Sequence, residues 1–496
     1  MARLRATVAR WIGGPPVERV TLRLPRRAYS GAGNSRLLAD MAGTADSANK
    51  STRYQAVTLR RRARELRENS PLVQRYAQLV RDNIIGPDGI TLQAQVPSTR
   101  GVNPGASAEI EAAWYAWAEA ATPDGQTLNT VLRQLAEAWR VEGEVLLELL
   151  PTSRSRYGLQ VRALDADLVD ETHNADRTPE GGTIVQGVEY GADGRIVRYH
   201  LWTDHPSEGV SRQRRTVSAE RILRLASRAR PGQTRGVTPL AAGMVMLQHL
   251  ERTEEALVVL NRIVASKMGA LMPGENATPL ESPDGSQDLP PEIEQAPGAW
   301  WTLPYGWDVK MLDPGQPTPN FEPFAQHLER NFAASVNVAY ASLTGDTSDL
   351  NYSTMRSALL LERDGWMGLQ AEFVDVVMRP LLQFWLRGAW YAGAITMPAG
   401  QSPLRIANQS VFHPRRWPWV DPLKDAKAVE SLLALGLTTR TREANKQGLA
   451  FADLLAERQA EDEAIAASGV VFGSAPAPSP EPPAMDTPIR TLRVAQ

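Results

Sequence analysis

The chain of 496 residues contains no cysteine, and its six histidines are scattered. Without cysteine there can be no disulfide, no thiolate zinc site and no cysteine nucleophile. No HExxH spacing occurs, so no metal site is predicted. The apolar stretch ALVVLNRIVA is well below the ~18 residues of a membrane helix, and the N-terminus lacks the apolar core of a signal peptide. We therefore expect no cofactor, no metal and no membrane association.

The chain also lacks a large net charge, which is −2 at pH 7. Such a balance gives no general attraction to nucleic acid, so any role with DNA must be local or must depend on DNA passing through. A hydrophobic content of 43% and a charged content of 22% are ordinary for a globular protein. The length favours two to four structural units.

The first half of the chain predicts an α+β unit. Residues 1–50 are polar and weakly patterned, which suggests an extended or partly ordered arm. Apolar residues at helical spacing then predict three helices, over 51–84, 106–120 and 127–142. Alternation by two predicts strands in EVLLELL, in LQVRALDADLV and in a hairpin that turns at Asp193-Gly194.

The second half is predominantly helical. Thr238 and Pro239 suit the start of a helix that runs to about Met268. Two more long helices are predicted, from Pro323 to Ser342 and from 353 to about 378, the last ending near Pro380. Residues 269–320 are rich in Pro and Gly, with a strand pair predicted around AWWTL and WDVKML. Shorter helices follow in LKDAKAVESLLAL and FADLLAERQAEDEAIAA, before a proline-rich tail predicted to be disordered.

The sequence offers one candidate for an active site, the acidic stretch LDADLVDETH. There is no GxxxxGK[ST] phosphate loop and no GxSxG elbow. A two-metal nuclease could use such a group of carboxylates. We favour a strand that leaves the core into a solvated acidic turn, because no further ligand clusters with the group in the sequence. Asp204 and His205 are interpreted as a loop. The residues concerned are Asp165, Asp167, Asp170, Glu171 and His173.

The strongest basic run is RRRARELR, which contains Arg60, Arg61, Arg62 and Arg64. It could contact DNA, and a sequence-nonspecific DNA-binding protein acting through it is a further alternative. It could equally be a solvated helix face whose charge Glu65 and Glu68 relieve.

A polar loop separates two of the long helices, in LTGDTSDLNYSTMRSALLLERD at 343–364. It carries Asp346 and Asp349 and no basic residue before Arg356. A plain connector, with Asp349 or Asn351 capping the next helix, would explain it. Long helices around a small insert, without a convincing active site, are typical of a structural subunit of an assembly.

Several stretches, in this order along residues 50–468, resemble the lambda family of tailed-phage portal proteins. Asn351-Tyr352-Ser353-Thr354 departs slightly from the family, which usually shows a second serine there. The N-terminal arm and the proline-rich tail lie outside the resemblance. The matching stretches are RRRARELRENSPLVQRYAQLVRDNIIGPDGITLQ, WRVEGEVLLEL, GVEYGADGRIVRYHLW, ILRLASRARPGQTRGVTPL, LTGDTSDLNYSTMRSALLLERD and VDPLKDAKAVESLLALGLTTR.

The resemblance implies an α+β, predominantly helical portal fold that assembles as a ring. Its regions would fall on this chain as follows: an N-terminal arm at 1–50, a wing at 51–236, a stem helix at 237–268, a clip at 269–320, a second stem helix at 321–342, a tunnel loop at 343–352, a long helix and the rest of the wing at 353–419, a crown at 420–468 and the tail at 469–496.

The resemblance also implies a function and partners. A portal is a non-enzymatic ring, typically of twelve subunits, at one capsid vertex of the virion, assembled in the host cytoplasm. The terminase large subunit packages double-stranded DNA through it, and the DNA is later ejected through it. Head-completion and tail proteins also dock to it. Major capsid protein and scaffold would surround it. The clip, with Trp300, Trp301 and Trp307, would dock the terminase and the connector proteins.

In such a ring the tunnel loop would meet DNA on every side. Its carboxylates would repel phosphate and its hydroxyls would form weak contacts, so DNA could slide. Helices are ~10 Å wide, so a ring of twelve leaves a bore of ~28 Å and a ring of six only ~9 Å, against ~20 Å for B-DNA. The predicted residues are Thr344, Gly345, Asp346, Thr347, Ser348, Asp349, Asn351, Tyr352 and Ser353.

Overall fold

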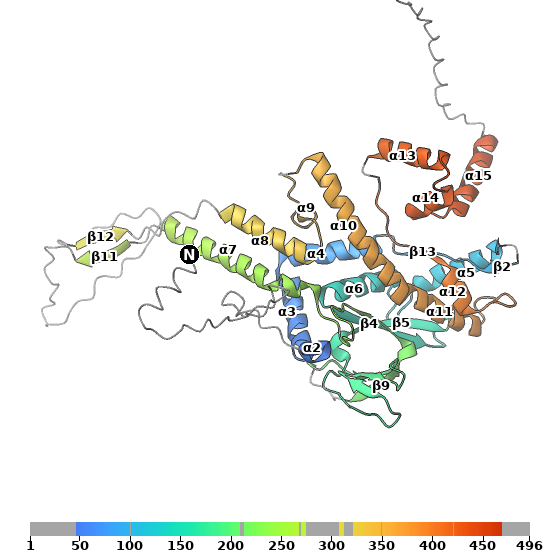
Figure 1. The fold of residues 1–496 in the computed structure, drawn as a ribbon, viewed down its shortest axis with the longest axis horizontal. Helices are drawn as coiled ribbons and strands as arrows, with labels where there is room; N and C mark the ends of the chain where they lie inside the picture. Colours follow the sequence, from blue (N-terminus) through green and yellow to red (C-terminus); the bar gives the residue numbers. More distant parts are fainter. Residues whose placement is uncertain are drawn as a thin grey trace, which may run out of the picture.

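The computed structural model of the protein describes residues 46–99, 101–208, 213–266, 269–273, 307–311, 321–348, 350–419 and 421–468. Figure 1 shows three parts. A body holds the sheets and the long helix α10. A projection, made of α7 and α8, leaves one side of the body and ends in the strand pair β11–β12. A group of C-terminal helices, α13 to α15, lies apart from the sheets.

The body begins with several helices, and the first of the predicted helices is divided in the structure. The expected helix over 51–84 is divided at Ser70, whose backbone is extended (φ −95°, ψ 120°). The reason is Pro71, because a residue before proline disfavours the helical region. The two other predicted helices are present. The elements are α2 (Ala48–Thr52), α3 (Gln55–Asn69), α4 (Pro71–Val80), the π-helical turn η3 (Arg81–Ile85), α5 (Pro104–Ala118) and α6 (Leu128–Val141).

Two antiparallel sheets follow. One has the order β10-β4-β5, from β4 (Glu144–Pro151), β5 (Leu159–Asp165) and β10 (Ile222–Ala226). The other has the order β6-β7-β8-β9, from β6 (Thr183–Val185), β7 (Val188–Tyr190), β8 (Ile196–Trp202) and β9 (Arg214–Ser218). The hairpin predicted at Asp193-Gly194 joins β7 to β8, and Gly194 adopts φ +76° in its turn. Strand β4 contributes Leu147 to the main core and Leu146 to a second apolar cluster, so it is buried on both faces.

The main core is rich in tryptophan. Trp114 and Trp117 of α5 pack against Trp385 of α11, with the Trp114 and Trp385 rings 5.2 Å apart, edge to face. Trp139 of α6 packs near Phe373. These contacts join the first third of the chain to its last third, together with the small pair of β1 (Thr91–Gln93) with β13 (Val411–His413). A second small pair, β2 (Pro97–Ser98) with β3 (Gly101–Val102), is a local hairpin.

The projection leaves the body where the sequence predicted a helix start. Thr238 accepts a hydrogen bond from the Leu240 N–H, as expected of a cap, but the first turn is the 3-10 helix η6 (Pro239–Ala242). Helix α7 (Met244–Ser266) then runs outward and α8 (Phe321–Ser335) returns. At the outer end β11 (Gly269–Pro273) pairs with β12 (Trp307–Met311). Of the two stretches predicted to pair, WDVKM is therefore a strand, whereas AWWTL lies outside the described residues.

Two predicted helix ends are corrected. The helix expected to reach Ser342 stops at Ser335, since Asn337 adopts the left-handed φ of +58° before the short helix α9 (Tyr340–Thr344). The helix expected to end near Pro380 continues instead. The π-helical turn η7 (Val374–Met378) precedes that proline and changes the hydrogen-bond register, so that its missing N–H is tolerated. The elements are α10 (Tyr352–Phe373), η7, α11 (Arg379–Tyr391) and α12 (Pro403–Gln409).

The C-terminal helices are α13 (Pro422–Ala434), α14 (Arg440–Lys446) and α15 (Phe451–Ser468). Across residues 421–468 the buried side chains are those of Ala444 and Ala450. None of the described helices is both long enough and apolar enough to cross a membrane.

Candidate channel loop and its supports

The loop between α9 and α10 is held by its own side chains. Gly345, at φ +80°, ends α9 and donates its N–H to the Ala341 carbonyl at 2.9 Å. The Asp346 carboxylate accepts from the Ser348 N–H at 3.0 Å and from the Ser348 hydroxyl at 2.5 Å. The Asn351 side chain caps α10 by accepting from the Thr354 N–H at 2.9 Å. The cap expected at Asp349 or Asn351 is thus made by Asn351.

The charge of the loop is negative and stable. The hydrogen bonds from Ser348 lower the pKa of Asp346 below its usual 3.8, so the carboxylate is ionised at neutral pH. Tyr340 of α9 places its hydroxyl 3.2 Å from both Asp346 and Glu329. Burial and these carboxylates raise the pKa of Tyr340 to about 12, so the phenol keeps its proton.

The predicted loop residues do not all lie in the loop. Thr344 ends α9, whereas Tyr352 and Ser353 begin α10. Asp349 lies outside the described residues. Exposed side chains belong to Thr347, Ser348, Asn351, Tyr352 and Ser353, and Asp346 is half-buried. The first cation after the loop, Arg356, pairs with Asp425 of α13 at 3.1 Å.

The basic run of α3 does not form one DNA-facing surface. Arg60 is 1% exposed and its guanidinium pairs with Asp167 and Glu171. Arg64 pairs with Glu142, Asp165 and Asp167 at 2.5 to 2.7 Å. The prediction for these two arginines is corrected by the structure, because this face of α3 packs against acidic residues of the body.

Arg61 and Arg62 are exposed on the other side of α3. A helix turns 100° per residue, so neighbours in a basic run necessarily point to different sides. The run therefore divides into the buried Arg60, the partly buried Arg64 and the exposed pair Arg61 and Arg62.

The acidic stretch at 165–173 is largely neutralised. Asp165 and Asp167 share Arg64, Glu171 pairs with Arg60, and the buried Asp170 pairs with Arg214. His173 lies edge to face with His200, with ring centroids 4.6 Å apart. Carboxylates so engaged with guanidinium groups are poor ligands for a pair of metal ions.

Sequence reasoning missed one neighbour of this group. His205, interpreted as part of a loop, brings its Nε2 to 3.9 Å from Asp165 and 3.8 Å from Asp167. These three are the described residues that come close enough together for a metal. Arg64 contacts both of the carboxylates, so the positive charge that a cation would supply is already present.

A second buried charge lies at the start of β4, at Glu144. It is fully buried and meets Arg235 at 2.6 Å, Arg224 at 3.2 Å and Arg60 at 4.0 Å. Burial alone would raise the pKa of Glu144, but the three arginines prevail and lower it. This ion cluster joins α3, β4, β10 and the segment before η6, so it braces the root of the projection.

Backbone contact is equally close at this root. A Cβ added at Gly236 would lie 2.1 Å from the Gly143 carbonyl oxygen, and one added at Gly143 would lie 2.4 Å from the backbone of Val237. The stretch RPGQTRGVTPL is thus explained in part by packing: Gly236 permits the approach and Arg235 neutralises Glu144.

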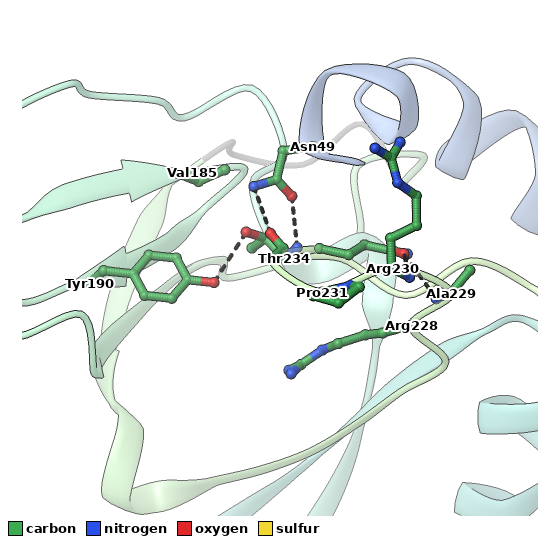
Figure 2. A pocket seen from close by; sticks show the side chains of 10 residues that line it. Asn49, Val185, Tyr190, Arg228, Ala229, Arg230, Pro231 and Thr234 are labelled. Carbon is green, nitrogen blue, oxygen red and sulfur yellow. Dashed lines mark hydrogen bonds between the residues drawn. The ribbon is translucent and has the colours of Figure 1, made fainter. Parts of the chain in front are cut away.

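A polar pocket of about 590 Å³ opens beside the same stretch (Figure 2). Tyr190 and Thr234 share a hydrogen bond of 3.1 Å between their hydroxyls, and Asn49 accepts from the Thr234 N–H at 2.7 Å. The lining contains cations and amides but no carboxylate and no histidine, hence no acid–base pair for catalysis. The lining residues are Asn49, Val185, Tyr190, Arg228, Ala229, Arg230, Pro231, Gly232, Gln233 and Thr234.

Of the three tryptophans predicted to dock the terminase, one is among the described residues. Trp307 begins β12, at the outer end of the projection. Trp300 and Trp301 lie outside the described residues.

Long helices that project from an α+β body and end in a small strand pair are typical of a structural component of an assembly. Residues 34–370 match the family described as phage portal protein, lambda family. The chain therefore belongs to the lambda family of phage portal proteins. Its predicted portal function, its α+β portal fold and its place as a component of the virion are confirmed at that level. Portal proteins of this family are structural, and none of the comparisons supports the nuclease alternative.

Individual relatives agree with the family. The chain is 27% identical over 396 residues to the probable portal protein of Halomonas phage phiHAP-1, covering 75% of this chain and 74% of that protein. It is 23% identical over 463 residues to portal protein B of Escherichia phage lambda, covering 82% and 84%. Among solved structures, a chain in the neck of a native GTA particle computed with C12 symmetry is similar, with 16% identity, coverage of 80% and 94%, and a TM-score of 0.48.

Proposed function

We propose that twelve copies of this chain form a ring around the path of double-stranded DNA, with residues 343–352 at its narrowest point. The proposal takes the wing as residues 51–236 and 353–419. The stem is then α7 and α8, the clip is 269–320 and the crown is 420–468. Twelve helices of ~10 Å width enclose a bore that passes a duplex of ~20 Å, whereas six do not.

The observation that carries the proposal is the chemistry of the loop. From Leu343 to Met355 the chain has two carboxylates, several hydroxyls and no cation. Asp346 is ionised, because Ser348 holds its pKa low. A surface of this kind repels phosphate at short range and forms no strong contact that would stall a moving polyanion.

The proposed partners are those expected of a portal protein. The clip at 269–320, which contains Trp300, Trp301 and Trp307, is proposed to dock the terminase large subunit and later the head-completion proteins. Its described strands, β11 and β12, lie at the outer end of the projection. Major capsid protein and scaffold would surround the body, and the C-terminal helices would face the capsid interior. Assembly would take place in the host cytoplasm.

The exposed arginines of α3 supply a second, weaker contact in the same proposal. Arg61 and Arg62 are the members of the basic run that remain accessible to DNA. Neutralising them should reduce salt-sensitive DNA binding by the subunit and leave ring formation unchanged.

The test reverses the charge of the loop. Replacing both Asp346 and Asp349 by arginine should leave rings intact in electron micrographs and should slow or stall DNA packaging, because twelve copies would add 24 cations around the duplex. Asp364→Arg, at an exposed position of α10, is the matched control. Normal DNA uptake by the double variant would contradict the sliding-loop proposal, and micrographs of single chains without a central hole would contradict the ring.

A further inference from the structure

Helix α9, which leads into the loop, is a short unit between two left-handed residues. Asn337 (φ +58°) precedes its five residues and Gly345 (φ +80°) follows them. Leu343 is its one fully buried side chain. A segment with so little buried apolar surface needs polar contacts to fix its position.

Two of those contacts come from one carboxylate on the long helix α10, and another comes from Arg75 of α4, whose Nε–H donates to the Ser342 carbonyl at 3.2 Å. Glu362 is 9% exposed and accepts three hydrogen bonds. The Ala339 N–H at the start of α9 donates to its Oε2 at 3.2 Å, and the Ser342 hydroxyl donates to the same oxygen at 2.6 Å. Its Oε1 accepts from the Trp366 Nε1–H at 2.9 Å, which fixes the carboxylate itself.

The packing of α10 brings this carboxylate close to the segment that precedes α9. A Cβ at Gly365, one turn after Glu362, would lie 2.7 Å from the Asn337 amide nitrogen. The atom concerned is the side-chain Nδ2 of Asn337, so the segment before α9 lies close to α10 at this point. Tyr340 of α9 in turn connects Glu329 of α8 with Asp346 of the loop.

We infer that Glu362 is a positioning residue of the channel loop: from α10 it fixes α9, and thereby sets where the loop presents Asp346. This inference rests on the proposed function of residues 343–352. It adds a residue outside the loop that controls the loop's place, and it assigns to the Tyr340 hydroxyl the connection between the loop and helix α8.

The first test is Glu362→Gln, which has the same shape. A glutamine has one acceptor oxygen, so its NH₂ must face either Trp366 or the pair of donors on α9. Losing a hydrogen bond to a charged group corresponds to roughly a tenfold or larger change in the local opening equilibrium. In assembled rings we expect the amides of residues 341–346 to exchange hydrogen at least about tenfold faster than in the wild type.

Controls separate a local effect from a global one. Glu372→Gln changes an exposed glutamate on the same helix and should leave the exchange unchanged. Ser342→Ala removes a single donor, keeps the carboxylate and should give a smaller increase, so it also serves if Glu362→Gln does not assemble. Wild-type exchange in Ser342→Ala and Glu362→Gln would overturn the inference.

A second measurement distinguishes failure of the inference from failure of the proposed function. A photo-crosslinker at Thr347 reports contact between the loop and DNA in loaded rings. Cross-linking in the wild type that falls in Glu362→Gln supports both. Faster exchange in Glu362→Gln without any cross-link in the wild type upholds Glu362 as a positioning residue and overturns the channel role. Wild-type cross-linking with unchanged exchange overturns the positioning role alone.

Discussion

The body and the C-terminal helices differ in how much of their stability lies within one chain. The body buries several tryptophans and also the ion cluster of Glu144. The C-terminal helices, although they span residues 421–468, bury two alanines and expose Leu423, Leu435 and Leu437 by 67% or more. The comparison teaches that the body is self-sufficient, whereas the C-terminal helices gain little from their own chain and leave apolar surface for contacts outside it.

The two regions also use charge differently. In the body, Glu144 and its arginines are removed from water, so each member depends on the others. At the C-terminal helices, the partly exposed pair of Arg356 and Asp425 connects α10 to α13. Breaking an ion pair in the body should therefore lower the unfolding free energy by several kcal/mol more than breaking one at the C-terminal helices. This difference can be tested in isolated subunits.

The largest effect is expected for Glu144→Ala. The change leaves buried guanidinium groups without their carboxylate, which costs ~3–5 kcal/mol of unfolding free energy. Thermal or denaturant unfolding of the subunit would measure it. Glu180→Ala, which removes an exposed partner of Arg198, should cost less than ~1 kcal/mol. Similar losses for the two variants would remove the distinction between buried and surface charge.

Gly243→Ala should come next. A Cβ there would lie 2.5 Å from the Phe332 ring and 2.6 Å from the Ser335 hydroxyl, where α8 packs on the root of α7. Phe332 is fully buried and has no room to move, so the expected loss is ~1–3 kcal/mol.

Gly368→Ala is the matched control for this substitution. A Cβ at Gly368, on α10, meets nothing within 4 Å. An alanine in an open helical position should raise the unfolding free energy by up to ~1 kcal/mol. If both substitutions raised the unfolding free energy, backbone propensity and not close packing would determine the effect at Gly243.

The pH dependence should follow Glu144. Its pKa is lowered in the folded protein from the usual 4.5, so its contribution is complete above pH 4.5 and is lost as pH falls through the lower folded value. One such carboxylate changes stability by at most ~1.4 kcal/mol per pH unit. Unfolding midpoints of wild type and Glu144→Gln between pH 7 and 3 should converge at the acid end. Parallel curves would contradict the assignment.

The smallest effect is expected for Asp425→Asn, which breaks the pair with Arg356. Both side chains are about 30% exposed or slightly less, so the loss should be ~1 kcal/mol or below. Removing residues 421–496 altogether should leave the unfolding of the body nearly unchanged. A large drop in the body's unfolding midpoint would show that the two regions are coupled more strongly than their contacts suggest.

Local signals in the sequence predicted much of this fold. Thr238 and Asn351 act as caps where their side chains and positions suggested, and Gly194 supplies the left-handed residue of the predicted hairpin. These features depend on neighbours a few residues away, and for that reason they can be read from the chain alone.

The features that the sequence did not predict depend on residues far apart in the chain. The ion pairs of Arg60 and Arg64, the approach of His205 to Asp165, and the partners of Glu144 all join residues about 40 to more than 100 positions apart. No spacing in the sequence reports such pairs. Glu362 was likewise invisible, because the donors that define its role are on a helix whose boundary at Ala339 the periodicity did not reveal.

The sequence by itself determined the α+β class, the order of long helices, the acidic loop between two of them and, through motifs in their family order, the portal family. Only the tertiary structure decided which charges are buried together, which arginines remain exposed and which carboxylate holds α9. The physical reason is one of range: caps, turns and periodicity follow from adjacent backbone, whereas the pairing of buried charges depends on how distant elements meet.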